Sequence, residues 1–148
     1  MRHSLGLITI GALVMTIVSI QPAHATSGDS FVLPSGKIRC MFFDIGTDKT
    51  PGNQILRCEV GGGIKPMPPQ PESCNLDWGS GLILNNAAQK AEVVCAGDTI
   101  YSPDSPTLNY GKTWRKNGFS CKASRNGLTC TNGKSNGFFL NNESWKTF

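Results

Sequence analysis

The fold of this chain is decided by one stretch of sequence, Trp114-Arg-Lys-Asn-Gly-Phe-Ser-Cys121-Lys-Ala-Ser-Arg-Asn-Gly-Leu-Thr-Cys130. Its turn signal is Ser124 to Gly127, because glycine readily adopts the positive φ that tight turns require. If these four residues form the loop, Cys121 lies directly opposite Cys130. Opposed residues of antiparallel strands are close enough for a disulfide. The stretch therefore predicts a β-hairpin closed by its own disulfide; the alternative is two unrelated buried thiols.

The first residues have the three regions of a secretory signal. Met1-Arg2-His3 is positively charged, an apolar run follows from Leu5 to Ile20, and Ala23-His24-Ala25 is a small-x-small cleavage site. We predict a signal peptide at 1–25, cleavage after Ala25, and a periplasmic or secreted protein. The alternative is an uncleaved anchor, but the run is shorter than the roughly 20 residues of a spanning helix. No later stretch is apolar enough to span a bilayer.

The predicted mature chain, residues 26–148, has the composition of one small β domain. Glycine, asparagine, serine and proline are abundant, as in loop-rich β proteins. Apolar residues alternate with polar ones at 38–42 and 56–60, which indicates a second hairpin. The predicted fold class is mainly β: a small, disulfide-stapled, antiparallel hairpin domain, either barrel-like or sandwich-like. A short C-terminal turn, capped by Asn142, is expected to end it.

All six cysteines lie in the predicted mature chain. An even number of cysteines in a small exported domain indicates a disulfide framework, although sequence alone does not choose the pairing. We expect sequential pairing, and the expected bonds are Cys40–Cys58, Cys74–Cys95 and Cys121–Cys130. The alternative is a structural zinc site, which normally needs cysteines two to four residues apart. No such pair occurs, so no metal is expected.

A proline-rich run, Pro66 to Pro71, separates Cys58 from Cys74. Such a run favours an extended conformation, which suits either a ligand for a partner protein or a crossover inside one domain. The cysteines on both sides favour the crossover.

Both histidines, His3 and His24, lie in the predicted signal peptide. The mature chain therefore lacks the base of Ser-His and Cys-His nucleophile pairs, and it lacks histidine metal ligands. We expect no cofactor, and the balance of motifs is against an enzyme.

The C-terminal part of the chain is basic. From Lys112 onward there are many lysines and arginines, and Glu143 is the only acidic residue. A basic surface suits an anionic envelope component or a glycan, and we expect no nucleic-acid partner. The alternative is that these charges lie on an ordinary solvent-exposed face without a specific partner. The candidate binding residues are Tyr110, Lys112, Trp114, Arg115, Lys116 and Arg125.

A different class of function depends on paired carboxylates. Two of Asp77, Glu92, Asp98 and Asp104 facing each other across a cleft would suit a small glycan hydrolase. The alternative is that Asp77 and Asp98 accept backbone hydrogen bonds at turns and that Trp78 is part of the core. A protease inhibitor is a third possibility, since rigid disulfide-bonded loops suit that role.

The cysteines and the residues around them also resemble a known family. The chain is similar to a family of small exported bacterial domains of unknown function, from about Phe31 to Phe148. The resemblance is carried by Phe31-x-x-Pro34-Ser35-Gly36-x-Ile38-x-Cys40, Cys58, Pro68-Pro69, Cys74-x-x-Asp77-Trp78-Gly79, Cys95-Ala-Gly-Asp98-Thr99, Leu108-x-Tyr110-Gly111, Phe119-x-Cys121, Gly127-x-x-Cys130-x-Asn132 and Gly137-Phe138-Phe139-Leu140.

The resemblance implies export and a disulfide-bonded, mostly β domain without an established activity. Members often have a histidine and a late arginine at the places of Asn136 and Asn142, so an activity that needs that histidine is not expected here. We expect a non-enzymatic exported domain that binds an envelope or extracellular partner, the glycan hydrolase being the alternative.

Overall fold

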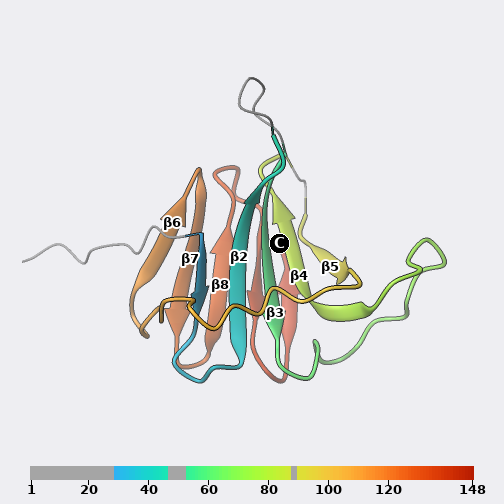
Figure 1. Ribbon diagram of the computed structural model, residues 1–148, viewed down its shortest axis with the longest axis horizontal. Coiled ribbons are helices and arrows are strands. Elements are labelled where there is room, and N and C mark those ends of the chain that lie inside the picture. The colour runs from blue at the N-terminus through green and yellow to red at the C-terminus, as the bar shows by residue number, and fades with distance from the viewer. Residues whose placement is uncertain (1–28, 47–52, 88–89) are drawn as a thin grey trace, which may run out of the picture.

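A computed structural model describes residues 29–46, 53–87 and 90–148. The predicted signal peptide, 1–25, lies outside the described residues and stays a prediction. Within the described residues there are two antiparallel sheets of five strands each, packed face to face (Figure 1). The predicted mainly β fold is therefore confirmed, as a sandwich and not as a closed barrel.

The first sheet has the order β1-β2-β3-β4-β5, so each strand pairs with the next one in the chain. Such a meander needs only short local connections between most of its strands. The strands are β1 (Ser30–Val32), β2 (Ile38–Asp44), β3 (Gln54–Val60), β4 (Trp78–Asn85) and β5 (Glu92–Cys95). β2 and β3 form the second predicted hairpin, and Cys40 lies directly opposite Cys58 in it.

The second sheet is also a meander, in the order β10-β9-β8-β7-β6. Its strands are β6 (Thr113–Lys116), β7 (Phe119–Ser124), β8 (Gly127–Thr131), β9 (Gly137–Leu140) and β10 (Trp145–Thr147). β6 and β7 are joined by Asn117-Gly118, whose φ angles of 45° and 87° are both positive. Two positive φ angles match the right-handed twist of the paired strands, which is why Asn-Gly is common in such turns.

The hairpin of β7 and β8 has the predicted register, with Cys121 opposite Cys130. The expected loop of four residues was wrong, because Ser124 and Gly127 pair with each other and leave Arg125-Asn126 as the loop. The Ser124 hydroxyl donates to the Gly127 carbonyl oxygen over 2.9 Å, which closes the turn. Gly127 has φ +146°, and an added Cβ would lie 2.7 Å from the Leu140 carbonyl oxygen.

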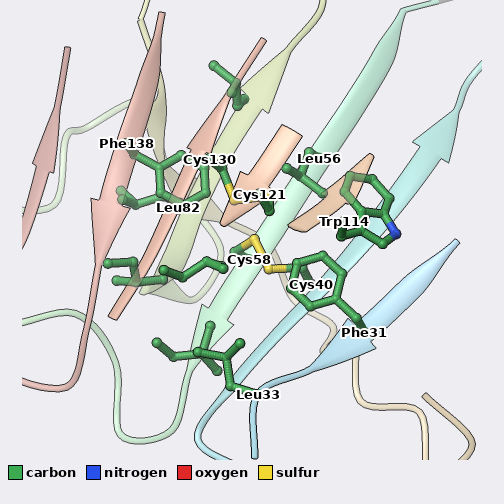
Figure 2. Close-up of a cluster of buried hydrophobic side chains, with 14 of the residues drawn as sticks. Phe31, Leu33, Cys40, Leu56, Cys58, Leu82, Trp114, Cys121, Cys130 and Phe138 are labelled. Carbon is green, nitrogen blue, oxygen red and sulfur yellow. A yellow bond between two sulfur atoms is a disulfide. The ribbon is translucent and has the colours of Figure 1, made fainter. Parts of the chain in front are cut away.

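The three expected disulfides are confirmed: Cys40–Cys58, Cys74–Cys95 and Cys121–Cys130. The first and third each join two neighbouring strands and face one another in the core (Figure 2). The sulfurs of Cys40, Cys58 and Cys130 lie within 4.8 Å of one another. This close group of sulfurs therefore consists of packed disulfides, not of free thiols with zinc-like spacing.

The core lies between the two sheets and takes the inward residues of both. Phe31 packs against Trp114, and Phe42 packs against Phe119, with ring centroids 5.3 Å and 5.9 Å apart. Burying a side chain of this size contributes about 1.5–3 kcal/mol to stability. These contacts fix the spacing of the sheets, so turns at one end of both sheets are held in constant relative positions.

The proline-rich run between β3 and β4 lies outside the sheets and is hydrogen-bonded to them. The indole nitrogens of Trp78 and Trp145 donate to the carbonyl oxygens of Pro68 and Pro66, each over 2.9 Å. The proline-rich run therefore packs on the domain, but the expected crossover was wrong: the run joins β3 to the neighbouring antiparallel strand β4 and is a long hairpin connection.

The connection from β5 to β6 crosses the outer face of the first sheet, coloured gold in Figure 1. It then forms a parallel bridge between Val32 and Thr107 at the edge of β1. Arg57, on the outer face of β3, donates to the side-chain and backbone oxygens of Asp98 in this connection. The connection therefore becomes part of the surface of the first sheet.

The expected cap of the last turn was misplaced by one residue. The Asn141 carboxamide oxygen accepts hydrogen bonds from the backbone amides of Glu143 and Ser144, over 2.9 Å and 2.7 Å. The carboxamide oxygen of Asn142, in contrast, has no hydrogen-bond partner. The turn leads into strand β10, which pairs with β9.

Candidate functional site

The predicted binding residues do not form one patch. Trp114 is 0% exposed and belongs to the core, so its proposed role in binding was wrong. The reason is its place on β6: Trp114 pairs with Cys121, and both side chains point toward the first sheet. The buried ring has no exposed surface for a ligand to contact.

Arg115 and Lys116 lie toward the far end of β6. Lys116 pairs with Phe119 at the Asn117-Gly118 turn, forms an ion pair with Asp29 and lies 5.1 Å from the centre of the Phe42 ring. The Arg115 guanidinium donates to the Ser120 hydroxyl over 3.0 Å. The structure therefore separates these two cations from Tyr110, which precedes β6 at its opposite end.

Tyr110, Lys112 and Arg125 lie together at that opposite end. The Gly111 amide donates to the Ala123 carbonyl oxygen over 2.8 Å, and the Ala123 amide donates to the Lys112 carbonyl oxygen over 3.0 Å. The Arg125 guanidinium carbon lies 5.6 Å from the centre of the Tyr110 ring, a distance typical of a cation–π contact. Half of the predicted set, Tyr110, Lys112 and Arg125, is thus brought to one place.

Two turns of the second sheet meet beside Arg125. One is the β7–β8 turn at Arg125-Asn126, and the other follows β9 and includes Asn141. The Asn141 carboxamide nitrogen donates to the Asn126 carbonyl oxygen over 3.0 Å. Both turns lie at the same end of the sheet because β7 and β9 run in the same direction, with β8 antiparallel between them.

These turns form a groove, here called the end groove. It has a volume of about 400 Å³ and is lined by Arg125, Asn126, Asn141, Asn142 and Glu143. A smaller cavity of about 90 Å³ shares four of these residues and adds Tyr110 and the β1–β2 turn at Ser35. The Asn141 carboxamide is used within the two turns, so the amide side chains left for a ligand are those of Asn126 and Asn142. Arg125 and Glu143 add one charge of each sign. The end groove therefore suits a ligand with many hydroxyl or amide groups.

The carboxylates proposed for hydrolysis do not meet in this groove. Asp98 accepts from Arg57 over 2.8 Å, and this hydrogen bond and the Arg57 charge hold the pKa of Asp98 below its ordinary value. Glu92 lines a cavity with Trp78 and Cys95, and within the described residues none of the other three proposed carboxylates lines it. Asp77 and Asp104 are exposed. This arrangement gives the hydrolase interpretation no specific support.

A second cavity involves residues that the sequence analysis missed. It is a cleft of about 270 Å³ on the outer face of the first sheet, and its lining includes Lys37, Arg39, Glu59 and Tyr101. The signal was present in the period-two pattern: Arg39 and Glu59 alternate with the inward cysteines, so they share the outer face. No sequence pattern indicated that Tyr101 would line this cleft, because it lies in the β5–β6 connection, which has no regular structure.

Comparison with known proteins gives a family but no function. The model of a family described as "Family of unknown function (DUF6636)" matches residues 12–148. No curated protein and no solved structure matches the chain significantly. Among the described residues there is no helix with the length and apolar character needed to cross a membrane.

Proposed function

Because this chain belongs to the DUF6636 family, whose function is unknown, we propose its role from its own geometry: a non-enzymatic exported domain that binds an envelope or extracellular glycan in the end groove. The observation that carries this proposal is the end groove itself, which is lined by three asparagines together with Arg125 and Glu143. Amide and charged side chains in an open groove match the hydroxyl and acetamido groups of polysaccharides.

The construction of the groove supports binding with little loss of entropy. Asn126 and Asn141 are joined by a hydrogen bond, and the hairpin that carries Arg125 is closed by Cys121–Cys130. A site that is already ordered before binding avoids the cost of fixing loops and side chains, which is about 0.5–1.5 kcal/mol for each immobilised side chain. The disulfides thus serve recognition as well as stability.

The proposal is tested by co-sedimentation of oxidised residues 26–148 with purified peptidoglycan sacculi, a glycan rich in acetamido groups. We expect saturable binding that Arg125→Ala and Asn142→Ala each weaken at least about fivefold, the usual effect of losing a hydrogen bond to a ligand. The matched control is Arg115→Ala, which removes an exposed arginine of the same sheet outside the groove. The control should bind as the native protein does.

Thermal unfolding of each variant shows that the domain is still folded. Absence of saturable binding, or equal loss in the Arg115→Ala control, contradicts the proposed role of the groove. Release of reducing ends from the sacculi would instead support the alternative function, a glycan hydrolase.

A further inference from the structure

The cleft on the outer face of the first sheet, here called the outer-face cleft, is built by three separate segments. They are the start of β2 with Lys37 and Arg39, the glycine turn 61–63 after β3, and the β5–β6 connection with Tyr101. The Gly61 amide donates to the Lys37 carbonyl oxygen over 2.7 Å, which ties the glycine turn to the start of β2. The bonds from Arg57 to Asp98 hold the third segment in place.

The acidic residue of the cleft, Glu59, is held by donors of the protein itself. Glu59 lies opposite Arg39 in the β2–β3 register, yet its ion pair is with Arg57. Its other carboxylate oxygen accepts from the Thr99 hydroxyl over 2.8 Å and from the Ile100 amide over 3.4 Å. Both oxygens of Glu59 therefore have donors from the protein, and the carboxylate is not available to Arg39.

Lys37 and Arg39 bring two positive charges to the cleft, whereas Arg57, Glu59 and Asp98 together carry one negative charge, so the excess is positive. Within residues 29–46, 53–87 and 90–148, neither side chain forms an ion pair with a carboxylate. The contact of Arg39 is instead with Tyr101, whose ring centre lies 4.8 Å from the guanidinium carbon. Two cations at one cleft repel each other, and a bound anion would relieve that repulsion.

The remaining walls leave room for a ligand. Gly62 and Gly63 have φ angles of +87° and +78°, so the glycine turn presents backbone without side chains at this place. Tyr101 is 59% exposed, although Arg39 lies against its ring. An exposed aromatic ring beside cations suits a ligand with a flat or ring-shaped body and an anionic group.

We propose that the outer-face cleft binds an oxyanion, a phosphate or a carboxylate, carried on a sugar ring that packs against Tyr101. Lys37 and Arg39 hold the anionic group, and the glycine turn allows it to approach the backbone. This site is separate from the end groove and adds a second ligand class to the domain. The end groove and the outer-face cleft share no lining residue. Ser35 lines the smaller cavity beside the end groove, and Lys37, two residues later, lines the outer-face cleft.

The test is an NMR titration of the isotope-labelled oxidised domain with four probes: glucose 6-phosphate, glucuronate, inorganic phosphate and glucose. We expect saturable shifts of the amides at 37–39, 61–63 and 99–101 with the anionic sugars and none with glucose. Comparison of glucose 6-phosphate with glucuronate decides between phosphate and carboxylate. Added salt should weaken binding, because screening reduces the attraction between charges.

Variants assign the binding to the cleft. Arg39→Gln and Lys37→Gln should each weaken binding at least about fivefold, because each removes a hydrogen bond to a charged group. Tyr101→Ala should weaken binding of glucose 6-phosphate more than binding of inorganic phosphate. The matched control is Lys122→Gln, an exposed lysine on β7 of the second sheet, and Arg125→Ala tests independence from the end groove. Unchanged affinity in Arg39→Gln and Lys37→Gln, equal binding of glucose, or no saturation with any anion overturns the proposal.

Discussion

The rings of Phe31 and Trp114 lie 5.3 Å apart in the core, between the edge strands β1 and β6, and the two residues occupy the same position in their respective sheets. Phe31 is on the first strand of the first sheet and pairs with Cys40, and Trp114 is on the first strand of the second sheet and pairs with Cys121. Each of these cysteines is bonded to the cysteine directly opposite it on the next strand.

The correspondence extends across both sheets. The fourth residue of the row is Leu82 in the first sheet and Phe138 in the second (Figure 2). Leu56 opposite Leu84 corresponds in the same way to Leu128 opposite Leu140. Strands at equal places in the two sheets, β4 and β9, also contact each other. The core is therefore built from two meanders with one plan, packed face to face with approximate two-fold symmetry.

Truncation of either Phe31 or Trp114 to alanine should destabilise the domain strongly. We expect Phe31→Ala and Trp114→Ala each to lower the free energy of unfolding by about 3–5 kcal/mol, because both side chains are fully buried. The double variant should reveal a coupling of about 1 kcal/mol between the rings. Urea unfolding measures these values, and Leu76→Ala, at a side chain that is 55% exposed, serves as control. Additive losses would show that the rings do not act as a pair.

The three disulfides should differ in their rate of reduction. Cys95 is exposed, and it lines an open cavity of about 380 Å³ with Cys74. The cysteines of the other two disulfides are at most 1% exposed. Because a thiol must reach a sulfur to reduce it, Cys74–Cys95 should be reduced first in the folded protein. Mild reduction followed by alkylation and mass spectrometry gives the order.

The Cys74→Ser, Cys95→Ser double variant is the matched comparison. It should lose roughly 3 kcal/mol of stability, since the disulfide joins residues 21 apart. Earlier labelling of Cys40 or Cys121 in the native protein would contradict the expected order.

The ion pair of Arg57 with Asp98 should add stability that depends on pH. The bond and charge of Arg57 lower the pKa of Asp98 in the folded state below the ordinary value of 3.8. A lowered pKa stabilises the fold above pH 3.8, and this contribution disappears as the pH falls through the folded-state value. The melting temperature of the native protein should therefore exceed that of Asp98→Asn at pH 7.

The difference between the two proteins should shrink progressively below pH 3.8. Asp104→Asn is the control, because Asp104 is an exposed aspartate in the same connection and forms no ion pair within the described residues. A difference that stays constant from pH 7 to pH 2 would contradict the assigned role of the Asp98 charge.

Several features of the candidate site were within reach of the sequence. The turn signal near Gly127 placed Arg125 at the tip of a hairpin, and the basic C-terminal part indicated a charged surface there. Trp114 was misassigned because an aromatic residue between polar residues looks the same whether it faces the core or a ligand. The role of the turn after β9 was missed, because contact between two turns depends on how strands β7 to β9 are ordered.

The repeated plan of the two sheets was also hidden from sequence comparison within the chain. The spacing between the two cysteines is 18 residues in the first sheet and 9 in the second. The two spacings differ because the connections between the strands differ in length, and a longer connection costs little free energy. The paired positions stay equivalent because the strand register is the same. Because the spacing between the cysteines differs, the equivalence of the two sheets cannot be recognised from the sequence.

Two hairpins and their disulfides, Cys40–Cys58 and Cys121–Cys130, were predictable from the sequence, through alternation of inward and outward residues, turn residues and opposed cysteines. These depend on neighbours along the chain, so local geometry is sufficient to predict them. The arrangement of the end groove and the outer-face cleft depends instead on how the strands and connections pack in three dimensions. Asn126 meets Asn141 because of the order of strands β7 to β9, and Arg39 meets Tyr101 because the β5–β6 connection crosses the first sheet. Such contacts join segments that are distant in the sequence, and no pattern of neighbouring residues indicates them.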